Sequence, residues 1–421
     1  MSCAENLSPE VRRSGRIYAY VSAVFGCVSE IMLDKSAVII LFISMIGGGE
    51  RMMMAVNSFS GILLMLLLIL CVSVISRVGL KRSAVLSCIA GCAGFLLLAS
   101  APWFGGFSRF AAVAGCFIYS LSRVPYGAAW YPMLDVFLRP EDRSGFFGGM
   151  RFTYMIFSTV LFFGIGLLMR RDPSLSLVQS MIALAGLGLL VRAWCIMRFP
   201  DDPAPVREVA DTRKALGISL HNRKLILYAV YVFLLTLATA AQLPLAYIYL
   251  KQYIRMEAGT VQIVSAVALA GCIIGHLFCT RGLNFLGIPG AERMVHLCYV
   301  LFTGMFFLLP VGIIGSPAVA AGVLFMVNFT MSVFMCCNSS EMLMLARPGN
   351  KVMAMAFVQT CSNAGAAVSQ GTISLILGST LLPSVCRVGG IEVNAYQMIF
   401  GFFFVWLLVL LAMQIRSPWS K

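Results

Sequence analysis

Charged residues are scarce in this chain. Only 11% of its 421 residues are charged, whereas 60% are hydrophobic, and a soluble domain carries roughly 25% charged residues. This composition excludes an ordinary soluble domain and predicts a protein that crosses a lipid bilayer many times. The apolar runs are about twice as long as the strands of a membrane barrel, so we expect the spans to be helices.

Nucleotide and metal motifs are also lacking. The chain has three histidines and contains no P-loop, dinucleotide fingerprint, nucleophile elbow or His/Cys metal cluster. We therefore expect no metal, no cofactor and no enzymatic activity. The fourteen cysteines lie mostly within apolar runs, where we expect small buried side chains rather than disulfides.

Twelve apolar runs divide the chain into two groups of six. The sequence predicts an all-α polytopic protein with one six-helix bundle over 17–197 and a second over 225–415. A polar linker, 198–224, joins the two bundles, and polar tails occupy 1–16 and 416–421.

The two halves repeat at one offset. Matching residues separated by 208 positions occupy the corresponding loop of each half, namely Gly79 and Gly287, Pro102 and Pro310, and Arg139 and Arg347. One offset that serves three loops indicates duplication. Two parallel six-helix repeats, related by an axis normal to the membrane, are typical of secondary transporters.

The distribution of basic residues predicts the orientation. Most of the 31 Lys and Arg residues fall in segments on the same side as the N-terminus. By the positive-inside rule we expect both termini and the linker to be cytoplasmic, in an inner or plasma membrane. The net charge of +14 follows from this topology, so we expect no nucleic-acid partner.

In these features the sequence resembles the major facilitator superfamily along nearly its whole length. The loop from Ser76 to Arg82 fits the basic part of a family loop pattern, although Ser76 replaces an acid, and the loop from Asp135 to Arg143 resembles the family's acidic-then-Arg signature. The resemblance implies gating roles for Arg77, Gly79, Lys81, Arg82, Asp135, Arg139 and Arg143. The alternative is that these are ordinary basic loops on the cytoplasmic side.

The same resemblance implies a monomer that works by alternating access. It also implies a central cavity lined by the first, fourth, seventh and tenth helices.

The first span, 17–45, carries three charges near its middle, at Glu30, Asp34 and Lys35. A charge at that depth costs at least about 2.5 kcal/mol, so such residues face water or one another. Glu30 and Asp34 are four residues apart and share one helix face. The alternative is a span that ends at residue 33, with Asp34 and Lys35 beginning an outer loop.

The fourth span carries polar side chains on one helix face. These residues are Tyr119, Arg123, Tyr126 and Trp130. Counting residues from opposite membrane surfaces places Glu30 and Arg123 at similar depth, which predicts an ion pair. With Asp34 and Lys35 they form a neutral group of four.

We interpret this group as a substrate and proton site, because a buried carboxylate can exchange a proton when no cation holds it ionised. The resemblance adds Gln242, Asn328 and Asn338 from the seventh and tenth helices. The alternative is that the charges form a structural salt bridge and the amides hold helices together.

The sequence thus predicts a secondary active transporter of a small polar organic solute. We expect proton coupling, as a symporter or antiporter. Two other classes stay open, namely an intramembrane enzyme using Glu30, Asp34 and Arg123, and a transporter-like receptor or structural membrane protein.

Overall fold

The computed structural model describes residues 7–139, 142–169, 173–200, 212–347, 350–377, 379, 385–388 and 391–416. Most of them are helical. The N-terminal half (7–200) contains α1 (Pro9–Asp34), α2 (Val38–Met45), α3 (Glu50–Val78), α4 (Leu80–Ser100), the 3₁₀ helix η2 (Ala101–Phe107), α5 (Ser108–Asp135), α6 (Arg143–Met169) and α7 (Leu175–Met197).

The C-terminal half (212–416) has the same plan with a few additions. It contains α8 (Thr212–Leu220), α9 (Arg223–Thr239), α10 (Gln242–Ile248), the π-helix η5 (Tyr249–Tyr253), α11 (Ala258–Leu308), α12 (Val311–Ile314), α13 (Pro317–Leu345), α14 (Lys351–Leu377), β1 (Val385–Val388), β2 (Ile391–Asn394) and α15 (Ala395–Arg416).

The helices are long and apolar enough for an integral, multi-pass membrane protein. Among the described residues, ten candidate spans meet that description, and one of them, Leu80–Leu134, covers both α4 and α5. The helix α14 is not among the ten, but it packs between α3 and α9. Counting α1 with α2, α9 with α10, and the two arms of α11 separately gives the twelve spans that the sequence predicts.

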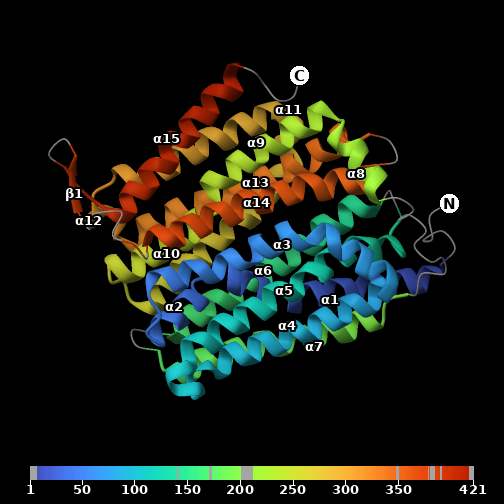
Figure 1. Cartoon of the computed structure of the whole chain (residues 1–421), viewed down its shortest axis with the longest axis horizontal. Coiled ribbons are helices and arrows are strands. Elements are labelled where there is room, and N and C mark those ends of the chain that lie inside the picture. Colours follow the sequence, from blue (N-terminus) through green and yellow to red (C-terminus); the bar gives the residue numbers. More distant parts are fainter. Residues whose placement is uncertain are drawn as a thin grey trace.

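The two halves lie one above the other in Figure 1, with the N-terminal half (blue to green) below the C-terminal half (yellow-green to red). Across their interface α3 packs against α14, and α6 against α11. The start of α1 lies at the same end as α8, which we call the linker end. The strands β1 and β2 lie at the opposite end, which we call the hairpin end.

Backbone geometry confirms that the halves repeat. Gly79, between α3 and α4, has φ of 94°, and Gly287, at the bend inside α11, has φ of 65°. Glycine adopts such values without the Cβ clash of other residues, so both turns need it. Pro102 lies at the start of η2 and Pro310 caps α12, so each proline begins a short helix at the hairpin end.

The first span is interrupted inside the protein. The helix α1 ends at Asp34 and α2 begins at Val38. Ser36 Oγ donates to the Met32 carbonyl (3.0 Å) and accepts from the Val38 N–H (3.3 Å), so it satisfies backbone groups at the break. Residues 38–43 are at most 2% exposed. The first span therefore contains a helix break at residues 35–37, and the segment after it is buried rather than an exposed loop.

The C-terminal half has a similar break between α9 and α10, at Ala240 and Ala241. Pro244 has no N–H to donate to the Ala240 carbonyl four residues earlier. The Gln370 side chain of α14 donates to this carbonyl instead (3.1 Å). Gln370 therefore links α14 to the break between α9 and α10.

Hydrogen bonds join the halves near the hairpin end. The Tyr247 hydroxyl donates to the Lys35 carbonyl (3.1 Å), and the Ala37 N–H donates to Ser265 Oγ (3.4 Å). Gln252 Nε2 donates to Ser44 Oγ (3.1 Å). Two of these bonds use backbone groups at the break between α1 and α2, so the C-terminal half stabilises that break.

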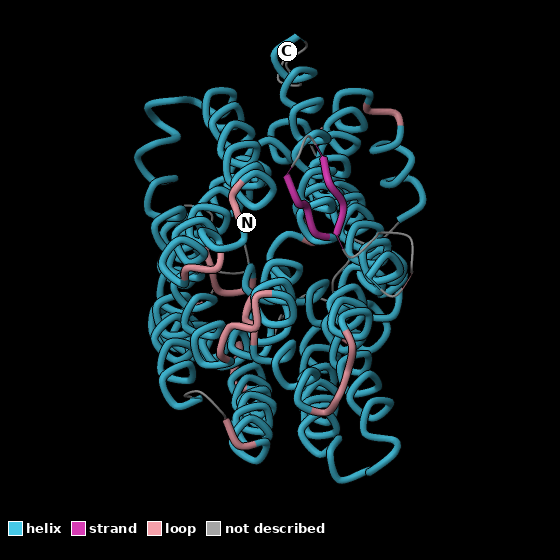
Figure 2. Tube along the Cα trace, turned by 90° about the vertical axis from the view of Figure 1, so that its left-hand side faces the viewer, coloured by secondary structure: helices cyan, strands magenta, loops and turns pink. Residues whose placement is uncertain are grey.

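The strands were not predicted from the sequence. β1 and β2 pair antiparallel, from Val385 opposite Asn394 to Val388 opposite Ile391, and Figure 2 shows them (magenta) in a chain otherwise drawn as helices and loops. The Asn394 side chain donates to the Tyr249 hydroxyl (3.3 Å) and Gln397 Nε2 donates to the Leu309 carbonyl (3.1 Å). These contacts attach the end of the hairpin to η5, and the start of α15 to the end of α11.

Candidate functional site

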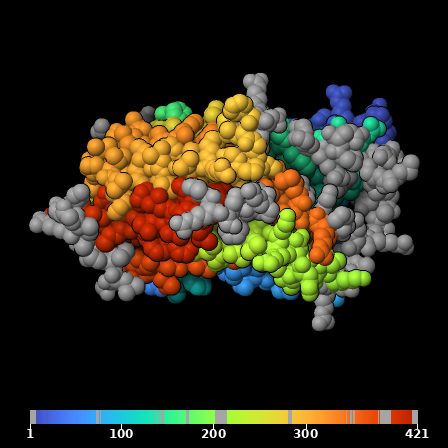
Figure 3. Space-filling model, turned by 90° about the horizontal axis from the view of Figure 1, so that it is seen from above, coloured from blue at the N-terminus to red at the C-terminus, as the bar shows by residue number. Residues whose placement is uncertain are grey.

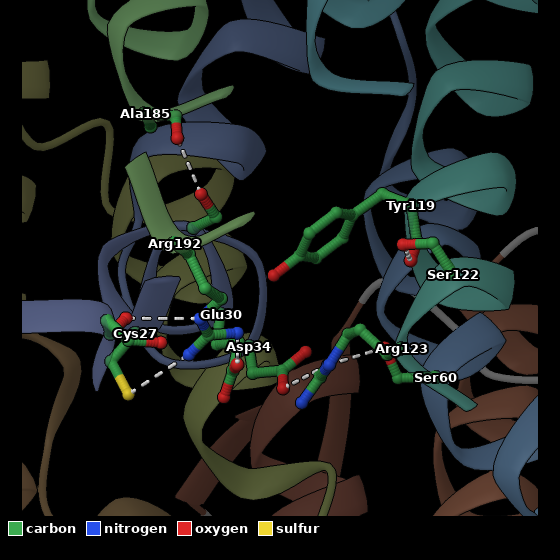
Figure 4. A network of polar contacts seen from close by, with 11 residues as sticks. Cys27, Glu30, Asp34, Ser60, Tyr119, Ser122, Arg123, Ala185 and Arg192 are labelled. Atoms are coloured by element: carbon green, nitrogen blue, oxygen red, sulfur yellow. Dashed lines mark hydrogen bonds and ion pairs between the residues drawn. The ribbon is translucent and has the colours of Figure 1, made fainter. Parts of the chain in front are cut away.

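Two ion pairs link α1 to its neighbours in the N-terminal half (Figure 4). Asp34 Oδ2 lies 2.6 Å from Arg123 Nη1 on α5, and Glu30 Oε1 lies 2.6 Å from Arg192 Nη1 on α7. The predicted pairing of Glu30 with Arg123 is therefore wrong. Counting residues from the two membrane surfaces places Glu30 and Arg123 at the same depth. It does not show which neighbouring helix the carboxylates of Glu30 and Asp34 face.

Arg192 is the functional candidate that sequence reasoning missed, because a basic residue so near the end of an apolar run is typical of a loop on the cytoplasmic side. Its side chain is 4% exposed. Its Nε donates to the Ser22 carbonyl (3.2 Å), and its guanidinium stacks over the Tyr126 ring at 4.2 Å. The signal in the sequence was the apolar flank on both sides of Arg192 (LLVRAWCIM).

Gly26 provides the space for this arginine. A Cβ at position 26 would fall on the Nε and Cζ atoms of Arg192. The guanidinium therefore lies directly against the backbone of α1, one turn before Glu30. Arg192 Nη2 also approaches Cys27 Sγ (3.8 Å), so this arginine follows the surface of α1 from Ser22 to Glu30.

Arg123 extends the network to α3. Its Nη1 donates to Ser60 Oγ (2.9 Å) as well as to Asp34, and Ser60 Oγ lies 3.3 Å from Ser120 Oγ. The Arg123 guanidinium lies 6.0 Å from the centre of the Tyr119 ring. We call Glu30 and Asp34 of α1, Arg123 of α5 and Arg192 of α7 the N-terminal charge cluster. Ser60 of α3 supports it by accepting from Arg123.

The structure brings together most of the polar side chains that the sequence places on one face of the fourth span. Tyr119, Arg123 and Tyr126 line one small cavity, and Trp130 stacks on Tyr126 with ring centres 5.4 Å apart. Residues from other helices complete the cavity lining, namely Ser87, Cys88, Leu189 and Arg192. The buried Tyr119 hydroxyl has no hydrogen-bond partner among the described residues, so it can bond to a ligand or to water.

The acids of the cluster are more accessible than the bases. Asp34 and Glu30 side chains are 30% and 27% exposed, against 19% for Arg123 and 4% for Arg192. Lys35, which is partly exposed, lies within electrostatic reach of Glu30. The sequence predicted a neutral group of two acids and two bases. Arg192 adds a third base, so the group carries one net positive charge.

The remaining predicted cavity residues make contacts inside the C-terminal half. Gln242 Nε2 donates to Thr303 Oγ1 of α11 (2.8 Å), and Asn328 Nδ2 donates to the Leu324 carbonyl (3.2 Å). Asn338 is 2% exposed, and its Oδ1 has no hydrogen-bond partner in the part of the chain that the structure describes. No contact between these three residues and the N-terminal charge cluster is seen in the described structure.

The predicted gating residues lie at the linker end. Arg77, Gly79 and Arg82 are exposed, and Arg139 is half-buried. Lys81 Nζ donates to the Phe199 carbonyl just beyond α7 (2.9 Å).

The loop between α5 and α6 contributes a contact that was not predicted, an ion pair between Asp142 and Arg16 of α1. The side chains of Asp135 and Arg143 lie outside the described residues. In the part of the chain that is described, no group of three or more His, Cys, Asp or Glu residues could hold a metal ion.

Comparisons with known proteins bear on the fold. No family model and no curated protein matches the sequence. A mutant of the nucleoside transporter NupG superposes with a TM-score of 0.74 at 12% identity, and the match covers 96% of this chain and 99% of that chain. A D-xylose-proton symporter matches with a TM-score of 0.67 at 11% identity, over 98% of this chain and 97% of that chain.

A bacterial metal transporter is also similar, with a TM-score of 0.61 at 14% identity and 98% of each chain covered. All three are transporters, although the solutes in their titles differ. Identities this low relate the chain to them in fold alone.

Proposed function

We propose that this chain, which has the fold of the major facilitator transporters, is a secondary active transporter of a small polar organic solute. It works as a monomer by alternating access and couples transport to protons. The observation that carries the proposal is the N-terminal charge cluster, which lies beside a helix break within a membrane span.

The position of the cluster supports a role in binding. Charges within a membrane span are costly and are by default functional, and backbone that is not helical is tolerated there only inside protein or beside water. Asp34 ends α1, and the carbonyl of Lys35 is exposed by the break and accepts from Tyr247. Carboxylates and backbone carbonyls that lie together accept hydrogen bonds from hydroxyl and amino groups, which suits a polyol, a nucleoside or an amine.

The unequal exposure of the ion pairs supports coupling. Asp34 is 30% exposed and pairs with Arg123, so a proton or a solute can reach the carboxylate while the guanidinium stays held by Ser60. Protonation of Asp34 would release Arg123 from the pair and change the charge offered to the solute. A D-xylose-proton symporter shares the fold, which supports the proton as the coupling ion.

The contacts between the halves support alternating access. The hydrogen bonds from Tyr247 and Gln252 to the N-terminal half lie near the hairpin end, so this arrangement is closed there. Rocking of the two halves would break these bonds and expose the cluster to the other side. Because basic loops gather on the cytoplasmic side of membrane proteins, we propose that both termini and the linker end face the cytoplasm.

Uptake into liposomes tests the proposal. Purified protein in proteoliposomes would be offered labelled sugars, nucleosides, amines and metal ions, with and without an imposed pH gradient. We expect accumulation of one organic class that requires the gradient and is abolished by a protonophore. Binding of a solute without transport would instead support a receptor, and chemical conversion of it would support an enzyme.

Asp34→Asn separates coupling from binding. We expect this variant to lose gradient-driven accumulation while it keeps solute exchange, because exchange need not release the proton. The matched control is Glu50→Gln, which changes a carboxylate at the start of α3, away from the cluster. Normal uphill accumulation by Asp34→Asn and by Glu30→Gln would remove these acids from the coupling role.

A further inference from the structure

The C-terminal half holds a second group of buried ionisable side chains. Glu292 on α11 and Glu341 on α13 are 2% and 4% exposed, and they are close enough for their charges to repel. Neither carboxylate forms an ion pair with a described residue, in contrast to both acids of the N-terminal charge cluster. A bare carboxylate in a dry interior is strongly disfavoured, so it either binds a proton or recruits a cation.

Tyr228 and Tyr231 of α9 and Cys337 of α13 lie within electrostatic reach of both Glu292 and Glu341. His296 follows Glu292 by four residues on α11 and so shares its helix face. Among the described residues, none of these neighbours carries a positive charge at neutral pH. Gln414 of α15 forms a hydrogen bond with Glu292. Figure 3 looks onto this half, with α11 (yellow-orange) beside α15 (red).

Several atoms of this group have unused hydrogen-bonding capacity. His296 is fully buried, and its Nε2 lies 2.8 Å from the Tyr231 hydroxyl. Glu292 Oε1, His296 Nδ1 and the Tyr228 hydroxyl are buried and have no hydrogen-bond partner among the described residues. Buried polar atoms are nearly always satisfied, so these atoms retain the capacity to bind a proton.

We propose that Glu292 and Glu341, with His296 beside them, form a proton-binding site inside the C-terminal half. A carboxylate oxygen forms an O–H bond with a proton from a hydronium ion as that ion's O–H bond breaks, leaving water, and the reverse transfer returns the proton to water. The site is separate from the N-terminal charge cluster and does not depend on the nature of the solute.

The fold gives this site a route to solution. Glu292 lies five residues after Gly287, at the linker-end bend of α11, and Glu341 lies four residues before Leu345, the last residue of α13. Both acids are therefore within two helical turns of the linker end. We expect the proton to exchange with the solution at that end.

Infrared spectroscopy of the purified protein tests the site with the proton itself as the probe. Protein labelled with ¹³C-glutamate should show the carbonyl band of a protonated glutamic acid at neutral pH. The band should shift in D₂O and disappear as the pH is raised. Glu292→Gln, which keeps the shape and the partner Gln414, should lose a large part of this band, and Glu341→Gln should alter its titration.

Glu10→Gln is the matched control, because Glu10 is an exposed glutamate in the first turn of α1, and its band should equal that of the wild type. If Glu292→Gln fails to fold, the titration of wild type and of Glu341→Gln decides. A wild-type protein without the band, or with a band that no accessible pH removes, would overturn the proposal. The measurement needs no solute, so it can fail while the transport proposal holds.

Discussion

The guanidinium of Arg192 occupies the space that a side chain at position 26 would need. Gly26 precedes Glu30 by one turn on α1, so the absence of a side chain there lets Arg192 reach the carboxylate while its Nε bonds to the Ser22 carbonyl. The ion pair therefore depends on a residue that takes no part in it.

Gly26→Ala should destabilise the protein, because the added methyl group meets Arg192 atoms in a packed interior. Overpacking of this kind costs about 1–3 kcal/mol, which a lower melting temperature in detergent would report. Gly127→Ala on α5 is the matched control, since a Cβ there meets nothing within 4 Å. Helix propensity alone should leave that variant unchanged or stabilise it by about 0.5–1 kcal/mol. Equal effects at both positions would contradict the account of Gly26.

Double-mutant cycles should measure a coupling free energy between Glu30 and Arg192. Removing one member of a buried pair strands the other, so Arg192→Gln should lower the melting temperature, by the equivalent of about 3 kcal/mol or less given the partial exposure of Glu30. Adding Glu30→Gln should recover part of this loss. The coupling of Glu30 with Arg192 should exceed its coupling with Arg123, which touches Asp34 instead. The reverse order would show that the carboxylates are paired differently in the membrane.

The stability cost of substituting Gln370 should depend on whether residue 244 is a proline. Gln370→Leu leaves the Ala240 carbonyl without its donor, and losing such a bond costs about 1 kcal/mol. In a Pro244→Ala background the restored N–H can bond this carbonyl within the helix, so the same substitution should cost less. Unfolding of the four proteins in detergent measures the difference. An equal cost in both backgrounds would mean that Gln370 acts through another contact.

Topology can be checked with reporters. Fusions after Lys421 and within residues 203–215 should both report the cytoplasm, because the basic loops favour that side. A fusion between residues 105 and 106, in η2 at the hairpin end, should report the other side and serves as the matched control. An external signal from either of the first two fusions would refute the proposed orientation.

The sequence was sufficient for the spans and the repeat, because these depend on long apolar runs and on turn residues. Gly79 and Gly287 were identified as a pair from spacing alone, and their positive φ values share one structural cause. The polar face from Tyr119 to Trp130 was also predictable, since helical periodicity fixes it before any tertiary contact forms.

The partners of the charges were not predictable in the same way. Whether Glu30 meets Arg123 or Arg192 depends on how α1 is rotated against α5 and α7, which counting residues along one helix cannot give. From the sequence alone, Arg192 has the position of a basic loop residue. Only the packing of α7 on α1 shows that its side chain lies against Gly26. The break after Asp34 depends on partners from the other half, namely Tyr247 and Ser265, and these are more than two hundred residues away.

At the break between α1 and α2, separation of the two halves and entry of water are linked. Its Lys35 carbonyl and Ala37 N–H are satisfied by side chains of the C-terminal half. If the halves part at the hairpin end, these backbone groups lose their donor and acceptor within the membrane, where an unmet group costs several kcal/mol. Water must then enter to replace them. Opening at that end is therefore inseparable from wetting a path to Asp34, the residue at which α1 stops.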